Sequence, residues 1–112
     1  MTIKVAFAPG ESSATIDPLH QWDFGQFLEI ESADFASGSA EAHFSCLEMT
    51  EAIVESCTVS NGCYTVKIPD SCLETGDDIT AWIYEILGSN GKTTKIITIP
   101  VIARPRPRRV SE

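Results

Sequence analysis

The most regular part of this sequence is residues 57–68, which read CTVSNGCYTVKI. Asn61-Gly62 is a preferred centre for a two-residue type I′ turn, because both positions of such a turn need a positive φ. The residues on either side alternate between apolar and polar, as they do in half-buried strands. The pattern therefore predicts an antiparallel hairpin in which Ser60 lies opposite Cys63.

Further strands are predicted on both sides of this hairpin. Residues 40–46 alternate cleanly, which predicts a strand with its apolar residues toward the core and His43 toward solvent. Shorter strands are expected at residues 3–7 and 26–30. Each of these segments is bounded by turn-forming residues, as strands of a small all-β domain are.

A second hairpin is expected near the end of the chain, where residues 79–87 and 93–103 flank Asn90-Gly91. A two-residue turn at that dipeptide would place Trp82 opposite Ile99 and Tyr84 opposite Ile97. Apolar residues occupy both faces of these strands. This two-sided pattern indicates central strands, or strands with one face covered by a partner.

Residues 68–76 between the two hairpins predict a single helical turn. Asp70 or Ser71 can cap such a turn, and Gly76 can end it. The remaining patterns have the period of strands and not of helices. The expected fold class is all-β, an antiparallel β-sandwich of about seven strands with one short helical turn.

Charge divides the chain into two parts. Residues 1–103 hold four lysines and fifteen acidic residues, a net charge of −11, whereas residues 104–112 hold four arginines and one glutamate, a net charge of +3. Pro105 and Pro107 each lack an amide donor, so this basic segment cannot continue a sheet ladder. We therefore expect a β-sandwich domain over residues 1–103, followed by a stiff exit strap or linker over residues 104–112, called the strap below.

Composition makes several classes of protein improbable. Apolar residues make up 43% of the 112 residues, as is typical of a globular domain. The net charge of −8 argues against nucleic-acid binding, because the body would repel phosphate. Residues 1–7 lack the charged and apolar regions of a secretory signal, and apolar runs fall short of the ~20 residues of a membrane span. We therefore expect synthesis in the cytoplasm and no membrane insertion.

The four cysteines predict buried free thiols. Cys46, Cys57, Cys63 and Cys72 include no Cys-x-x-Cys pair, which argues against structural zinc. In the predicted hairpin Cys57 and Cys63 point to opposite faces, so they cannot bridge in that register. Disulfides in other pairs remain the alternative, although a cytoplasmic compartment disfavours them.

No residue pattern predicts catalysis. Asp23-Phe24-Gly25 matches a kinase triplet, but the phosphate loop and catalytic segment that accompany it in kinases are missing. Glu74, Asp77 and Asp78 are acidic neighbours without the spacing of a calcium loop. The sequence therefore predicts no enzyme, no metal and no cofactor.

Five pieces of the chain together resemble a known family. They are the aromatic-Asp-aromatic-Gly-Gln segment at Trp22, Asp23, Phe24, Gly25 and Gln26; a strand at residues 42–45; the turn of Ile68, Pro69, Asp70 and Gly76; the hairpin around residues 79–93; and the exit through Arg104, Pro105, Arg106 and Pro107. In this order they resemble the N-terminal domain of baseplate or tail-tip structural proteins from siphophages and prophages of Gram-positive hosts, similar to the upper baseplate protein. The resemblance spans about residues 20–107.

The resemblance implies a virion structural protein that is assembled in the host bacterial cytoplasm and incorporated into the tail or baseplate. Its expected role is to attach a distal appendage or a receptor-binding protein, with other tail or baseplate proteins and other copies of the chain as partners. Aromatic anchors dominate protein interfaces, which makes Trp22, Phe24, Trp82 and Tyr84 candidate docking residues. Candidate electrostatic contacts are Arg104, Arg106, Arg108 and Arg109.

Two other classes of function stay open from sequence. Trp22, Phe24 and Phe27 could form a platform on which sugars stack, as aromatic rings do in carbohydrate-binding or cell-surface-binding β-sandwiches, or they could form a core cluster at the start of a strand. A small enzyme would need a histidine beside a cysteine or serine in a cleft. The sequence has two histidines, His20 and His43, and neither stands in a recognisable catalytic pattern.

Overall fold

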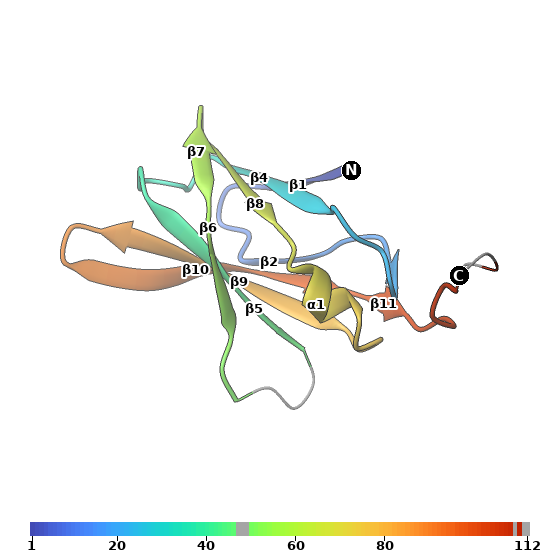
Figure 1. Ribbon diagram of the computed structural model, residues 1–112. Helices are drawn as coiled ribbons and strands as arrows, with labels where there is room; N and C mark the ends of the chain where they lie inside the picture. Colours follow the sequence, from blue (N-terminus) through green and yellow to red (C-terminus); the bar gives the residue numbers. More distant parts are fainter. Residues whose placement is uncertain (47–49, 109, 111–112) are drawn as a thin grey trace.

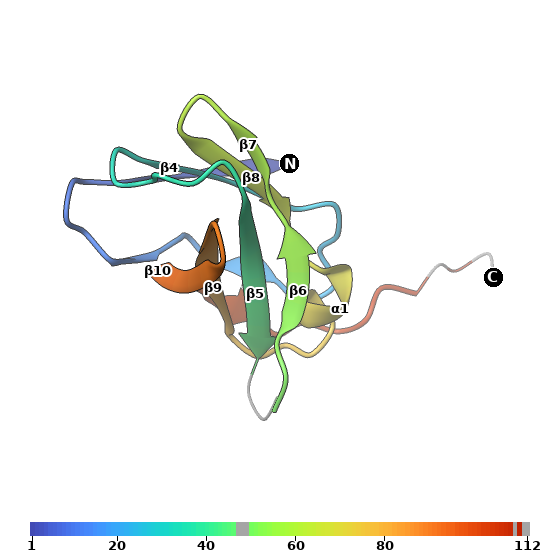
Figure 2. The same ribbon diagram turned by 90° about the vertical axis from the view of Figure 1, so that its left-hand side faces the viewer.

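Two large facing sheets, a small third sheet and a short helix form the fold in the computed structural model, which describes residues 1–46, 50–108 and 110 of the chain. The first sheet has the strand order β1-β4-β8-β7. Figure 2 shows this sheet above the second one. The bounds of its strands are β1 Thr2–Phe7, β4 Phe27–Ser32, β7 Thr58–Ser60 and β8 Cys63–Lys67.

The second sheet has the strand order β2-β10-β9-β5-β6. Its central strands β9 and β10 form a long hairpin that projects beyond the rest of the molecule on the left of Figure 1. Its bounds are β2 Ser13–Thr15, β5 Ala40–Cys46, β6 Ile53–Ser56, β9 Ile79–Leu87 and β10 Asn90–Ile99.

A small third sheet and the helix lie near the opposite end. Strand β3 (Leu19–His20) pairs in parallel with β11 (Val101–Ile102), and α1 (Asp70–Leu73) is the short helical turn. Figure 1 shows α1, β11 and the start of the strap together on the right. The all-β class with one short helical turn is confirmed.

The sheets are mixed, which the expected antiparallel pattern did not include. Strands β1 and β4 run parallel, as do β2 and β10. Parallel neighbours need a crossover connection. The chain provides this crossover. After β1 it enters the second sheet as β2, then forms β3 of the small third sheet, and returns to the first sheet as β4.

The core is made of the alternating apolar residues that the strand patterns predicted. Along β5, every second residue from Ala40 to Cys46 is buried, and His43 lies on the other face. Large side chains from both sheets meet in the core, among them Leu28, Ile30, Phe44, Tyr64, Ile83 and Ile97. Burial of these side chains is the main favourable contribution to folding.

The first predicted hairpin is confirmed in its register. Ser60 pairs with Cys63 and Val59 with Tyr64. Asn61 has φ 50° and Gly62 has φ 77°, the two positive values that a type I′ turn requires.

The second hairpin has a different register from the one predicted. Leu87 pairs with Asn90, so the turn residues are Gly88 and Ser89, and Gly88 takes the positive φ of 63°. A bulge between Thr93 and Lys95 shifts the register further. As a result Trp82 lies opposite Ile96 and Tyr84 opposite Thr93, and the predicted pairs with Ile99 and Ile97 are wrong.

Gly91 explains why the Asn-Gly signal was misleading. A Cβ on Gly91 would lie 2.1 Å from the hydroxyl oxygen of Tyr84, so the ring of Tyr84 occupies the space above this glycine. The residue is therefore a glycine to make room for a ring, and the turn forms at the preceding glycine, Gly88.

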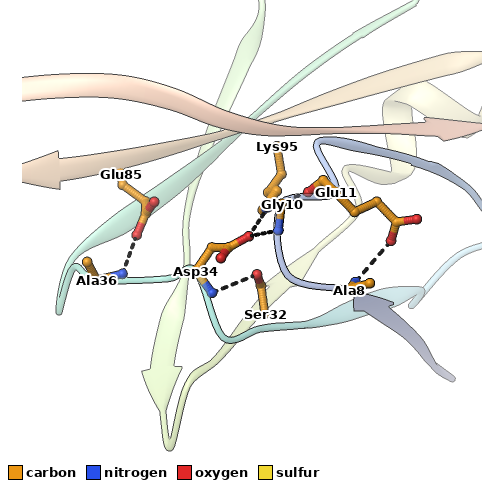
Figure 3. A network of polar contacts seen from close by, with 8 residues as sticks. All are labelled: Ala8, Gly10, Glu11, Ser32, Asp34, Ala36, Glu85 and Lys95. Carbon is orange, nitrogen blue, oxygen red and sulfur yellow. Dashed lines mark hydrogen bonds and ion pairs between the residues drawn. The ribbon is translucent and has the colours of Figure 1, made fainter.

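Buried polar groups connect the sheets to their crossover loops (Figure 3). Lys95, only 4% exposed, contacts Asp34 at 2.9 Å and also donates to the backbone oxygen of Glu11. Glu85 is 3% exposed and accepts hydrogen bonds from the hydroxyl of Tyr64 at 2.6 Å and from the amide of Ala36 at 3.1 Å. Burial acts to raise the pKa of Glu85, but these hydrogen bonds outweigh it and hold the pKa below its ordinary value.

The pair of Tyr64 and Glu85 gives a prediction for stability. Tyr64→Phe removes a hydrogen bond to a buried carboxylate, so we expect a loss of about 2 kcal/mol in the free energy of unfolding at pH 7. Urea denaturation followed by circular dichroism measures it. Tyr84→Phe, on the outer sheet face, is the matched control and should change stability by less than about 0.5 kcal/mol.

The same pair sets the direction of the pH dependence. The pKa of Glu85 is lower in the folded than in the unfolded chain, so its ionised form contributes stability above the ordinary value of 4.5, and this contribution is lost as pH falls through the folded pKa. The stability difference between the wild type and Tyr64→Phe should therefore shrink below about pH 4. A difference that stays constant down to pH 3 would contradict this account.

Candidate functional site at the strap end of the sandwich

Three segments that are far apart in the sequence meet where the strap leaves the body. They are the loop before β4 (residues 21–26), the turn around α1 (residues 68–76) and the chain after β10 (residues 101–106). We call this group the exit clasp. Figure 1 shows α1, β11 and the start of the strap gathered there.

Gln21 joins all three segments. Its Oε1 accepts a hydrogen bond from the amide of Arg104 at 3.1 Å, and its Nε2 donates to the backbone oxygen of Glu74 at 2.8 Å. The side chain lies against Gly76, where a Cβ would come within 3.0 Å of Oε1. Gly76 also has a φ of +76°, a conformation that favours glycine. The helical turn ends earlier than predicted, at Leu73 with Glu74 as its C-cap, so Gly76 lies beyond the cap, where it makes room for Gln21.

Trp22 holds the strap through both its ring and its indole N–H. Nε1 donates to the backbone oxygen of Arg104 at 3.2 Å, and the guanidinium of Arg106 lies 5.3 Å from the ring centroid, within cation–π range. Trp22 has a φ of 75°, which costs about 1–2 kcal/mol for a residue with a Cβ. Its amide is fixed by a 3.2 Å hydrogen bond to the oxygen of Leu73. A strained residue at such a position often serves a function.

Asp23 and Asp70 order the loop that carries Trp22. Asp23 accepts a hydrogen bond from the amide of His20 at 2.9 Å, and Asp70 accepts one from the amide of Gly25 at 3.1 Å. The backbone oxygen of Gln26 accepts from the amide of Ile68 at 2.8 Å, which joins the loop to the segment before α1.

The predicted helix cap is therefore wrong. The N-cap of α1 is Pro69, and among the described residues no side chain caps it. Asp70 belongs to the first turn and uses its carboxylate for the loop before β4. Because Asp70 and Gly25 lie 45 residues apart, local spacing could not reveal this contact.

The described part of the strap leaves the body after the clasp. Residues 104–108 are exposed and take part in no strand, within the described part of the chain. Pro105, Pro107 and Arg108 are among them, whereas Arg109 lies outside the described residues. The clasp therefore fixes the strap at Arg104 and Arg106 and leaves Arg108 exposed to solvent.

The four candidate docking aromatics fall into two separate groups. Trp22 and Phe24 belong to the exit clasp, where Phe24 is 78% exposed. Trp82 and Tyr84 are half-buried on the outer face of β9, away from the core. Tyr84 stacks on His43 with ring centroids 4.8 Å apart. His43 was expected to face solvent, and it is on that face, but half-buried and 3.1 Å from Glu41.

Sequence reasoning missed Gln21 as a site residue. It stands beside Trp22, yet glutamine in a polar loop is common, and nothing in its neighbours indicates a contact with Arg104. The strap group that donates to Gln21 is the backbone amide of Arg104, which no residue type identifies. Only the fold brings these groups together.

A carboxylate beside the clasp is bonded to the backbone, and two cysteine thiols, one of them in α1, are protonated. Asp78 accepts a hydrogen bond from the amide of Val101 at 3.0 Å. Burial raises the pKa of Cys57 to about 12 and that of Cys72 to about 11, so both thiols are protonated at neutral pH. Among the described residues, no group of three or more His, Cys, Asp or Glu side chains is placed to hold a metal ion.

Sequence comparisons with known proteins give no match, so any proposal of a function rests on the geometry described above. No family model matches the chain, and no curated protein matches its sequence. In the part of the chain that the structure describes, helices long and apolar enough to cross a membrane are absent.

The role of Trp22 can be tested with one substitution. Trp22→Phe keeps an aromatic ring but removes the indole N–H, so we expect the strap to loosen at Arg104. A lost hydrogen bond of about 1 kcal/mol corresponds to roughly fivefold faster exchange of the Arg104 amide. Hydrogen exchange followed by NMR measures this rate.

The matched control for that test is Trp82→Phe, the same change on the outer face of β9. It should leave the exchange of the Arg104 amide unaltered. Equal rates in the wild type and in Trp22→Phe would show that the indole N–H does not hold the strap.

Proposed function

We propose that the chain is a non-enzymatic structural module of a phage tail. In this role the β-sandwich is a rigid body attached to neighbouring tail or baseplate proteins, and the strap leads toward a distal appendage or a receptor-binding protein. Such a module needs a fixed exit for the connecting chain and no catalytic group. The exit clasp would provide the fixed exit for the connecting chain.

The observation that carries this proposal is the meeting of three of the five family-like segments at one end of the molecule. The amide of Gly25 donates to Asp70 and the oxygen of Gln26 accepts from the amide of Ile68, while Asp23 orders the same loop by accepting from the amide of His20. The strap of Pro105 and Pro107 begins beside the same loop. Three segments that resemble one family in sequence order therefore also form a single site in space, which supports a shared purpose for these three.

The physical chemistry of the clasp suits an attachment point. The strap is held through its backbone at Arg104 and through the side chain of Arg106, so its direction is fixed relative to the sandwich. Proline at positions 105 and 107 limits bending just beyond this point. A neighbouring protein would thus meet the strap in a defined orientation, which reduces the entropy lost on assembly.

One observation favours a second candidate, a carbohydrate-binding or cell-surface-binding module. Trp82 and Tyr84 lie on one open sheet face, and Thr80 and Thr98 are paired beside Trp82 on that face. Aromatic rings next to hydroxyl groups suit stacking and hydrogen bonding with a sugar. This face lies outside the exit clasp, so it does not explain why the strap is held.

Mass spectrometry of purified particles tests the leading proposal. Particles prepared after induction of the source bacterium should contain peptides of this chain at a fixed ratio to tail proteins. Particles without these peptides, from cells that express the chain, would overturn the proposal.

A titration with cell-wall polysaccharide separates the two candidates. A saturable change in tryptophan fluorescence that is lost in Trp82→Ala and kept in Trp22→Phe would favour the carbohydrate-binding module. A flat response, together with virion peptides, would favour the tail module.

A further inference from the structure

The longest edge strand of the sandwich is β1. The first sheet ends in β1 and β7, and the second ends in β2 and β6. Strand β1 has six residues, whereas β2 and β7 have three each and β6 has four. It also pairs with β4 in unbroken register from Thr2 to Phe7. Long, regular edges of this kind are the ones that accept another strand.

The hydrogen-bond pattern shows which residues of β1 have unused backbone groups. The amide of Phe27 donates to the oxygen of Met1 at 2.9 Å. In a parallel ladder alternate residues direct both backbone groups to the same neighbour, so Met1, Ile3, Val5 and Phe7 bond to β4. Thr2, Lys4 and Ala6 therefore direct their N–H and C=O groups to the free edge.

A groove lies beside this edge. It has a volume of about 400 Å³ and is lined by residues of β1 on one side and by residues 14–19 on the other. Half-buried Ile3, Ala14 and Ile16 give it an apolar lining. A strand added to β1 would gain backbone hydrogen bonds at the edge and would cover this lining.

The chain offers two extended segments as occupants from a second copy, and only one has the necessary amides. In the described part of the strap, the amide and oxygen of Arg104 are already bonded to Gln21 and Trp22, and Pro105 and Pro107 have no N–H, so only Arg106 and Arg108 could donate to a ladder. Strand β1 itself has unused N–H and C=O groups on the very edge that would pair. Its alternation also places its larger apolar residues on the core side.

We propose that β1 pairs antiparallel with β1 of a second copy, around a two-fold axis at Val5, with Lys4 of each copy opposite Ala6 of the other. The two Lys4–Ala6 pairs each exchange two N–H···O bonds. An axis at Lys4 would instead place two lysines directly opposite each other, which is destabilising. Ala6 is small and leaves room for the stem of Lys4. This pairing is independent of the proposed function.

Salt distinguishes this dimer from one formed through the strap. Each body carries a net charge of −11, so the pairing of two bodies is opposed by long-range repulsion that salt screens. The β1 dimer should therefore strengthen between low and physiological ionic strength. A contact between the basic strap and an acidic body would weaken over the same range.

Two substitutions at Ala6 test the arrangement in the full-length chain, with sedimentation equilibrium as the measurement. Ala6→Glu places a carboxylate opposite Lys4 of the other copy and should tighten the dimer about two- to tenfold, whereas Ala6→Lys should weaken it by a similar factor. If only the net charge of the body mattered, Ala6→Lys would tighten the dimer and Ala6→Glu would weaken it. Ala6 is exposed, so both variants should fold.

A backbone substitution tests the hydrogen bonds. Lys4→Pro removes an amide at the free edge without removing a bond to β4, and should abolish the dimer. Lys4→Ala keeps the amide and should keep the dimer. Circular dichroism reports whether Lys4→Pro is folded; if it is not, the two Ala6 variants decide.

Three results would overturn the proposal. They are a wild-type chain that stays monomeric at the highest concentration reached, a tighter dimer in Ala6→Lys than in Ala6→Glu, and a folded Lys4→Pro variant that dimerises like the wild type. A monomer would leave the groove to a strand of a different protein.

Discussion

A buried ammonium group fixes where this chain crosses between its two sheets. Lys95 extends from β10 to Asp34 in the loop after β4, and to the backbone of Glu11 in the loop after β1. A buried charge is costly unless it is paired, so each crossover loop must stay in place to satisfy it. The hydrogen bond from Lys95 and that from the amide of Gly10 lower the pKa of Asp34, which keeps its charge beside the lysine. The parallel pairing of β1 with β4 requires such a crossover between them.

Local sequence patterns predicted the strands and turns of this fold better than they predicted which strands pair and in which register. The Asn61-Gly62 turn and the alternation along β5 were read correctly, because each depends on residues that are neighbours in sequence. The second hairpin was misread because Gly91 makes room for the ring of Tyr84, a requirement set by packing and not by the backbone. Parallel pairing was missed since an apolar–polar alternation has the same period in both kinds of sheet.

The site was predictable only in part, for a related reason. The segments around Trp22, Asp70 and Arg104 could be picked out by their resemblance to one family, but their contacts span up to 83 residues. The hydrogen bonds between them use the backbone oxygen of Arg104 and the amide of Gly25, groups that every residue or nearly every residue has. Gln21 had no distinctive pattern at all. A sequence can thus indicate that such segments matter before it can show that they touch.

The position of the strap has a mechanical consequence. Residue 104 follows β11 closely, and β11 follows β10, a central strand that is paired on both sides by β2 and β9. Tension applied through the strap would run along these strands, so the hydrogen bonds of the ladders would be loaded together in shear and not opened one after another. The bonds of Gln21 and Trp22 to Arg104 would share the first part of that load with the loop before β4. A sandwich built in this way would resist extension best in the direction in which its connecting chain leaves.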